Sequence, residues 1–588
     1  MERRVLLAIS LSFAVLFLYQ ALVVPPPRPS EDPTNVTAPP PAATPDPTLG
    51  AAPPLAGSLT PGNTTAPAPA PLPAASAIVG DTEERQIVLE SPHVRAAFTN
   101  RGGRLRHWVL KEYLNDLGEP IDLVPEIVPP DLPLPFSLRV DDPAASQRLN
   151  EALYQVSQPD DGTVVFAFEG EDGLRARKTF TLDPDTFIVS FTAHVQQGDQ
   201  VLNPVVQWGP GMTDEIARTE RGSFLSPSFI YHAQAIYHPL ADSVEREAAT
   251  GLFPTAVREG EYRWAGVDDH YFISAVLHPP APLRLEYQPV SIPTPTSPPQ
   301  VGQYVSYSVR FPAPPEQVRF YVGPKQLDVM RSIDPEFTRA IYFGIFAWLA
   351  APLLDALRWV YGYVGSWGWS IIVLTIIINF VMFPLRHKSV VSMRKMQELQ
   401  PQMKAIQERY AKYKITDPER QKMNQEVMEL YRTKGVNPAS GCVPMLITLP
   451  FLFAFYSMLS QAIEIRGQSF WWIPDLALRD PWYIVPLFMG LTMFWQQRLM
   501  PTTADPTQQK IMMFMPVMIT VTMLFAPSGL VIYWLVSNVW AIGQQYFTNW
   551  LIGPPKVPAP APAKARPAKA GRPARAGEVP RSAEARKN

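Results

Sequence analysis

Five apolar runs in the C-terminal part of the chain constrain its fold more than any other feature. They are residues 370–385, 442–462, 483–495, 511–526 and 530–546. A helix needs about 20 apolar residues to cross the hydrocarbon of a bilayer, and the last three runs lie below that length. Either they recruit flanking polar residues or the bilayer is thinned around them. The runs predict an α-helical bundle of five core transmembrane helices.

A further apolar run, residues 5–24, follows a charged N-terminus. A cleaved signal peptide begins in the same way. However, this run is long enough to span a membrane, the cleavage sites around Ala21 are poor, and prolines follow at once. We therefore interpret residues 1–24 as an uncleaved transmembrane anchor. Residues 25–77 are rich in proline, alanine and threonine, and we interpret them as a disordered linker.

Charge is segregated along the chain. Residues 25–365 carry 24 Lys+Arg and 40 Asp+Glu, residues 386–440 carry 12 and 6, and residues 554–588 carry 9 and 2. Basic loops of membrane proteins stay in the cytoplasm. If residues 340–354 formed a span, both basic segments would lie outside. We therefore interpret residues 336–365 as an amphipathic interfacial helix on the outer surface, and predict six spans with both termini cytoplasmic.

Residues 78–330 carry the pattern of a β-rich domain. In residues 189–195 (VSFTAHV) apolar and polar side chains alternate, and residues 164–168 and 305–311 repeat this period of two. Turn signals built from glycine, proline and aspartate separate the segments. Many short alternating strands with little helical periodicity predict a large all-β sandwich.

We find no catalytic constellation in this domain or elsewhere in the sequence. Asp268, Asp269 and His270 are adjacent, but convergent ligands and a supporting polar shell do not accompany them, so ordinary strand and turn chemistry explains them better. Phosphate loops, zinc-protease motifs and nucleophile elbows are missing from the sequence, and the single Cys442 excludes Cys-rich metal sites. We predict that the protein is not an enzyme and uses no cofactor, metal or small-molecule substrate.

Residues 386–440 form a basic segment with helical spacing. Apolar residues recur every three or four positions: Met393, Met396, Leu399, Met403, Ile406, Tyr410 and Tyr413. Asp417 and Pro418 supply an N-cap and a first-turn proline for a second helix, which Gly435 ends. The segment predicts a helical hairpin. Its apolar residues either pack on each other, which the spacing alone favours, or form an adaptable docking surface. The candidate residues of that surface are Met393, Met396, Met403, Arg394 and Lys395.

Several short motifs stand in one order along the C-terminal part. They include GSWGWS (365–370), VNP (436–438), PTT (501–503), QQKIM (508–512), FMP (514–516) and PSGL (527–530). Together they resemble the Oxa/Alb/YidC family of membrane protein insertases. The match is dense over residues 365–550, and weaker matches at 99–103 and 321–324 extend it into the β-rich domain. This is the arrangement of the Gram-negative form, which has one anchor span and a large periplasmic domain.

The resemblance implies a multi-pass protein of the bacterial inner membrane that inserts and folds other membrane proteins, alone or with the Sec translocon. The five core helices would enclose a hydrophilic groove open to the cytoplasm and to lipid. The expected partners are nascent membrane proteins, the lipid bilayer, the Sec translocon and, through the basic disordered tail (residues 551–588), the ribosome. Binding of anionic lipid, or a role limited to topology and solubility, explains the tail equally well.

One departure from the family concerns the middle of the second span, where the family usually has an arginine and this chain has Asn379. Arg386 follows seven residues later, at the cytoplasmic end, so we expect the groove to lack its charge. Thr375 shares a face with Asn379. The family pattern adds Tyr533 and Trp534 on the last span. Asn538 on the same span is a further polar candidate, for which the alternative is an interhelical hydrogen bond. The candidate groove residues are Asn379, Thr375, Tyr533, Trp534 and Asn538.

The spans alone also allow a channel or a secondary transporter. Such proteins usually show repeated halves and interrupted helices, and no internal repeat is found among the five runs. The basic hairpin would have no role in that scheme. A tethered carbohydrate-active enzyme would leave the five later spans without a purpose.

Overall fold

The computed structural model describes residues 77–553 except 116–117, 126–127, 130–131, 210–211, 213–232, 294–300, 414–416, 437–442 and 500–505. It divides into two compact units, one up to Tyr342 and the other from Phe343 onward, with residues 505–512 grouped with the first. The predicted N-terminal anchor, nearly all of the linker, and the tail from residue 554 lie outside the described residues.

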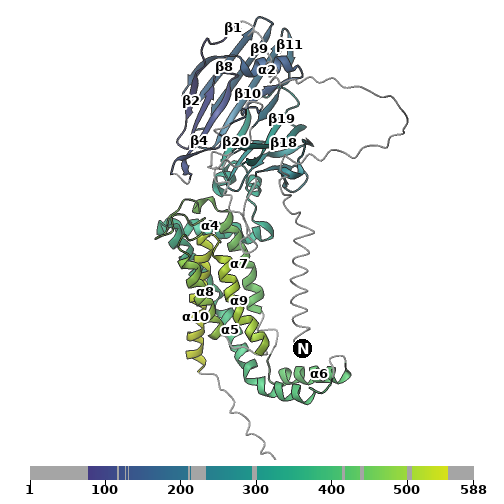
Figure 1. Ribbon diagram of the computed structural model, residues 1–588, viewed down its shortest axis with the longest axis vertical. Helices are drawn as coiled ribbons and strands as arrows, with labels where there is room; N and C mark the ends of the chain where they lie inside the picture. Colours follow the sequence, from purple (N-terminus) through teal and green to yellow (C-terminus); the bar gives the residue numbers. More distant parts are fainter. Residues whose placement is uncertain are drawn as a thin grey trace, which may run out of the picture. The chain divides into compact units, whose positions relative to one another are not determined.

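The first unit is a β-rich domain of three antiparallel sheets (Figure 1). The eleven-stranded sheet contains β1 (Ala77–Val79), β7 (Gln155–Asp160), β8 (Thr163–Gly170), β9 (Leu174–Leu182), β10 (Ile188–Gln197), β11 (Gln200–Leu202), β13 (Gln234–Pro239), β14 (Glu245–Ala248), β16 (Tyr262–Asp268), β17 (Phe272–Leu277) and β20 (Val318–Pro324). The five-stranded sheet contains β6 (Ser137–Arg139), β12 (Val205–Trp208), β15 (Ala256–Gly260), β18 (Leu283–Pro293) and β19 (Val301–Arg310). The four-stranded sheet contains β2 (Gln86–Glu90), β3 (Val94–Thr99), β4 (Arg104–Leu114) and β5 (Pro120–Asp122).

Aromatic side chains join these sheets into one core. Phe180 and Phe191 pair across β9 and β10, and their ring centroids lie 5.0 Å apart on one face of the large sheet. The centroid of the Phe180 ring lies 4.6 Å from that of Phe98 in the four-stranded sheet. It lies 5.0 Å from that of Phe136, just before β6. The Phe136 ring also contacts Trp208 of the five-stranded sheet at 5.4 Å. Both smaller sheets therefore pack on the large one, as the alternating pattern of β8, β10 and β19 predicts.

Two buried lysines of this domain have polar partners. Lys178 donates to the carbonyl oxygens of Gly102 at 2.7 Å and Phe136 at 2.8 Å, and burial holds the pKa of Lys178 well below its usual range. Lys325 forms an ion pair with Asp268 at 3.0 Å, and both side chains are buried. Asp268 thus has a structural role, which agrees with its interpretation as ordinary strand chemistry. Within the described residues, no group of three or more His, Cys, Asp or Glu side chains is suited to a metal.

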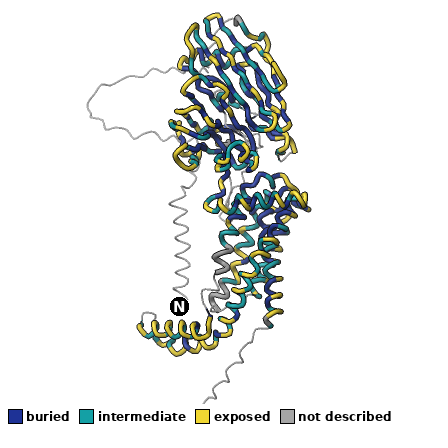
Figure 2. The backbone as a smooth tube through the Cα atoms, turned by 180° about the vertical axis from the view of Figure 1, so that it is seen from behind, coloured by how far each residue is buried: buried dark blue, intermediate teal, exposed yellow. Residues whose placement is uncertain are grey.

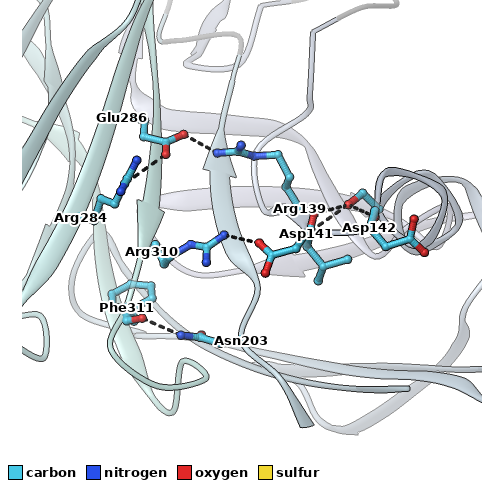
Figure 3. A network of polar contacts seen from close by, with 10 residues as sticks. Arg139, Asp141, Asp142, Asn203, Arg284, Glu286, Arg310 and Phe311 are labelled. Atoms are coloured by element: carbon cyan, nitrogen blue, oxygen red, sulfur yellow. Dashed lines mark hydrogen bonds and ion pairs between the residues drawn. The ribbon is translucent and has the colours of Figure 1, made fainter. Parts of the chain in front are cut away.

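A charged network joins strands β18 and β19 of the five-stranded sheet to the segment around β6 (Figure 3). Glu286 accepts from Arg139 and lies 3.4 Å from Arg284, and Asp141 pairs with Arg310 at 2.9 Å. Each arginine has a carboxylate partner and is partly exposed. Exposed pairs of this kind contribute about 0–1 kcal/mol each, so the network adds only a little to the stability of the domain.

The chain leaves the β-rich domain later than the sequence predicts. After α2 (Pro143–Glu151) and the short turn η1 (Ala249–Gly251), the last elements of the domain are α3 (Leu327–Ile333) and η2 (Pro335–Ala340). Phe337 in η2 is fully buried, with its ring 5.4 Å from Trp264 and 5.2 Å from Tyr321. Arg246 donates to the carbonyl of Arg339 at 2.8 Å. Residues 335–342 therefore belong to the domain instead of beginning an interfacial helix.

The second unit is helical. It contains η3 (Gly344–Phe346), α4 (Ala347–Val364), α5 (Trp367–Arg409), α6 (Pro418–Thr433), α7 (Val443–Gln461), η5 (Ile463–Ile465), α8 (Ile484–Leu499) and α10 (Ser528–Ile552), and α9 (Pro506–Met523) reaches into it from residue 513. Within the segment predicted to be an interfacial helix, α4 begins only at residue 347, because Pro335 and Gly344, with φ +64°, interrupt the chain before it. Leu353, Leu354 and Leu357 form its buried face.

Each of the five apolar runs overlaps a helix, in order α5, α7, α8, α9 and α10, although three of the runs extend past the ends of their helices. Among the described residues, α5 is the helix long and apolar enough to cross a membrane, and residues 512–523 form a shorter apolar helix. Small residues allow close packing, as at Gly490 of α8, where an added Cβ would lie 2.2 Å from the hydroxyl oxygen of Thr520 in α9. Figure 2 shows buried positions concentrated in the β-rich domain, with α6 largely exposed or half-buried.

Candidate functional site

Polar side chains lie along one face of α5, within its apolar part. Thr375 and Asn379 are one turn apart, and Arg386 follows two turns later. Thr375 is fully buried, and its hydroxyl donates to the carbonyl of Ile371 at 2.6 Å. The amide of Asn379, which is 3 % exposed, donates to the carbonyl of Thr375 at 2.8 Å. The structure therefore places Thr375 and Asn379 together, as their spacing predicts.

Helix α10 supplies the other half of this arrangement. The Asn379 amide nitrogen lies 3.4 Å from the hydroxyl of Ser537, which is also hydrogen-bonded to Tyr533 one turn earlier. The Tyr533 ring stacks on Phe455 of α7, with centroids 4.2 Å apart. We refer to Thr375, Asn379, Arg386, Ser537 and Tyr533 as the polar cluster. It joins α5 to α10 within the largely apolar part of the bundle.

Arg386 lies closer to Asn379 than their separation in the sequence suggests. Its Nη1 donates to Oδ1 of Asn379 at 2.7 Å, so the guanidinium reaches back two turns toward the middle of α5. Side chains on a helix lean toward its N-terminus, and the long stem of arginine can cover the distance. The cluster therefore contains a cation, although residue 379 itself is neutral. The seven-residue spacing, which places both residues on one face, was the available signal.

The helices that contain the five apolar runs supply no carboxylate to this cation. The sequences of α5 up to Leu385, α7, α8, α9 and α10 contain no Asp or Glu. Within the described residues, the guanidinium makes its hydrogen bond to Asn379 and no ion pair. The Arg386 side chain is half-buried and interacts electrostatically with Tyr533. An arginine stays charged in proteins, so a positive charge lies beside the buried amide.

The two remaining groove candidates lie differently. Asn538, 5 % exposed, directs its amide to α8, where it lies 3.4 Å from the carbonyl of Met489 and 3.3 Å from the hydroxyl of Thr492. It faces a helix seam and not the polar cluster, which is the alternative that the sequence left open for it. Trp534 is half-buried on the turn between Tyr533 and Asn538. Ser537, which sequence reasoning did not select, takes the place of Asn538 in the cluster.

Helices α5 and α10 run in the same direction (Figure 1). Their contacts, in order along both chains, are Asn379–Ser537 at 3.4 Å, Phe383–Gln544 at 3.2 Å, His387–Thr548 at 3.2 Å and Arg394–Gly553 at 2.8 Å. The hairpin that continues α5 and the end of α10 therefore lie on one side of the bundle. The predicted topology also puts them on one side.

The hairpin has an apolar seam of its own. Leu399 of α5 packs with Tyr431 and Val436, and Met396 and Met403 pack against them. The hydroxyl of Tyr431 donates to the sulfur of Met403 at 2.9 Å. Met393 is half-buried, Arg394 is buried and Lys395 is exposed. Self-packing therefore occupies two of the three candidate methionines. Asp417 caps α6 by accepting from Glu419 N at 3.0 Å, as predicted.

Comparisons with known proteins cover both units. Residues 86–356 match the family described as YidC periplasmic domain, and residues 359–553 match 60Kd inner membrane protein. The chain is 34 % identical over 582 residues to the membrane protein insertase YidC of Syntrophus aciditrophicus, with 93 % of this chain and 99 % of that protein covered. It is 35 % identical over 500 residues to that of Oleidesulfovibrio alaskensis, with 81 % and 88 % covered. A crystal structure of an active YidC insertase with its first transmembrane domain resolved aligns with 81 % of this chain and 95 % of that chain, at 16 % identity and a TM-score of 0.33.

A β-rich periplasmic domain followed by apolar helices with an internal polar cluster defines an integral inner-membrane protein. The extent and identity of the sequence matches identify the family to which the chain belongs. The chain belongs to the YidC family of membrane protein insertases. That family consists of insertases and not of enzymes, as the sequence predicts.

Proposed function

We propose that this protein inserts and folds inner-membrane proteins by receiving client segments at the polar cluster. The observation that carries the proposal is the hydrogen-bonded set of Asn379, Ser537 and Arg386 between two apolar helices. A polar client loop costs several kcal/mol for each bare polar group that enters hydrocarbon. Hydrogen-bonding groups partway across reduce that cost. Related chains of nearly the same length carry the name of membrane protein insertase, which supports the proposal.

The client itself supplies the driving force in this proposal. The sequence has no nucleotide-binding motif, so energy from nucleotide hydrolysis is not available within the chain. Burial of the client's apolar segment in lipid contributes about 25 cal/mol per Å². The polar cluster therefore only has to lower the barrier for the loop that crosses, after which the apolar segment holds the client in place.

The topology is part of the proposal. Helices α5, α7, α8, α9 and α10 are the five core spans, residues 5–24 are the anchor, and both termini and the hairpin are cytoplasmic. The positive charge of residues 386–440 and 554–588 supports this orientation, as does the parallel course of α5 and α10. Nascent membrane proteins and lipid are the primary partners. The Sec translocon, and the ribosome through the basic tail, are proposed from the family resemblance.

Reconstitution in liposomes tests the proposal. Wild-type protein should insert a client with a polar translocated loop and a client with a short, weakly polar loop. Asn379→Leu should reduce insertion of the first client and spare the second. The matched control is Asn538→Leu, the same change at an amide that faces α8, which should leave the two clients in their wild-type ratio. If Asn379→Leu inserts each of the two clients as well as wild type does, the proposed role of the cluster is refuted.

A further inference from the structure

Arg394 stands out in the part of α5 that continues into the hairpin. This arm is basic, and most of its charged side chains are exposed, as Lys395 is. Arg394 is only 8 % exposed. Arginine is almost never buried without a partner, because its charge loses hydration. A buried position for Arg394 therefore requires a hydrogen-bond or charge partner.

That partner is the end of another helix. Arg394 Nη1 donates at 2.8 Å to the carbonyl oxygen of Gly553, the residue that terminates α10. The last carbonyl groups of a helix have no partner within the helix, and that end carries a partial negative charge. A guanidinium satisfies both conditions. Two turns earlier on α5, His387 Nδ1 lies 3.2 Å from the hydroxyl of the fully buried Thr548.

These contacts attach residues 387–394, the base of the hairpin, to α10. From Arg394 to the end of α5 at Arg409 the helix runs for fifteen more residues, or about 22 Å at 1.5 Å per residue. The seam around Leu399 and Tyr431 attaches α6 to this arm. In Figures 1 and 2 the arm and α6 project beyond the helices of the bundle. A small change of angle at the base therefore moves the far end of the hairpin a long way.

We propose that Arg394 is the positioning residue of the hairpin. By binding the C-terminal carbonyl of α10, it fixes the angle at which the hairpin leaves the bundle. The basic segment 554–588 begins at the residue directly after the acceptor. A partner that holds this segment therefore acts on the same bond. Loosening the last turn of α10 releases the hairpin, and ordering that turn sets the hairpin in place.

Amide hydrogen exchange of the full-length protein in lipid nanodiscs tests the proposal, and it does not depend on insertion activity. In Arg394→Gln, amides of residues 388–400 should exchange about tenfold faster, the effect expected for one charge-assisted hydrogen bond. The matched control Lys395→Gln removes the same charge one residue later, at an exposed side chain, and should change nothing. Arg394→Lys keeps a cationic donor and should recover part of the protection.

Two shortened chains test the acceptor in place of the donor. A chain that ends at Gly553 keeps the acceptor as a carboxylate and should keep the wild-type protection. A chain that ends at Leu551 lacks the acceptor and should match Arg394→Gln, and adding Arg394→Gln to it should have no further effect. The proposal is overturned if Lys395→Gln accelerates exchange equally. It is also overturned if the chain ending at Leu551 stays protected, or if exchange rises throughout the bundle and not only in the hairpin.

Discussion

Weakening the β-rich periplasmic domain should leave insertion intact. The domain has its own core, and we find no catalytic constellation in its sequence, so we expect its stability and the insertion activity to be uncoupled. Phe180→Ala is the sharpest perturbation. Phe180 is fully buried, and its ring lies within 5.0 Å of Phe98, Phe136 and Phe191. Truncation therefore leaves a cavity where the sheets meet.

Removing a buried phenylalanine costs about 3–5 kcal/mol. For a domain of this size each kcal/mol lowers the unfolding midpoint by about 2–4 °C, so we expect a decrease of about 6–20 °C. The matched control is Thr181→Ala on the same strand, where the side chain is exposed and the cost should stay within about 0.5 kcal/mol. Proteolysis of the domain along a temperature ramp measures both midpoints.

The decisive assay is client insertion at a temperature between the midpoints of the two variants. There the domain of Phe180→Ala is unfolded and that of Thr181→Ala is folded, and both should insert clients at the same rate. Loss of insertion only in Phe180→Ala would show that the folded domain takes part. A midpoint shift below about 2 °C would instead refute the packing argument. A deletion test should remove residues 78–341, because a deletion that leaves Phe337 behind would expose its buried ring.

Further predictions concern pH and the hairpin. Burial lowers the pKa of His238 below 6.5, so the folded domain binds a proton more weakly than the unfolded chain, and stability should fall as pH drops below about 6.5. His238→Gln should flatten the decrease of the unfolding midpoint between pH 7.5 and 5.5, and an unchanged slope would contradict this. Deleting residues 395–433 removes both arms together and should abolish client insertion while the bundle stays folded. Unimpaired insertion would show that the hairpin has no working role.

Local patterns made much of this fold predictable. The alternation in β10 and β19 and the cap at Asp417 depend on neighbours in the sequence, so period and residue type suffice to find them. The start of α4 was harder to predict. The apolar residues before residue 347 look like a continuation of the helix, but Phe337 is held by the β-rich domain, a contact far away in the sequence.

The site could be predicted only in part, because it depends on which faces of two helices meet. Spacing on α5 identifies Thr375 and Asn379, and it also contains the signal for Arg386. On α10, neighbouring residues differ in direction by about 100°, so Ser537 faces α5 while Asn538 faces α8. Nothing in the sequence of α10 alone determines which of the two belongs to the cluster. Packing against α8 decides it.

Moving the charge along α5 tests the cluster most directly. From the sequence, Asn379→Arg should be tolerated, because a hydrated groove accepts a guanidinium. The structure changes this expectation, because Arg386 already lies 2.7 Å from the Asn379 side chain. Two like charges about 5 Å apart repel by about 3 kcal/mol at an effective dielectric constant near 20. We therefore expect Asn379→Arg to lower both the yield of folded protein and client insertion.

Combining Asn379→Arg with Arg386→Asn exchanges the two side chains, keeps one guanidinium beside one amide, and should restore both properties. Arg386→Asn alone should keep the fold but lose the cation, whereas Lys388→Asn removes an equal charge from an exposed position and should have no effect. Insertion at matched expression, together with the melting temperature, measures all four variants. If Asn379→Arg alone matches wild type, the two side chains do not face each other in the membrane. If the exchanged pair is as poor as the single variant, the repulsion argument fails, because the fold then requires the particular order of amide and guanidinium along α5.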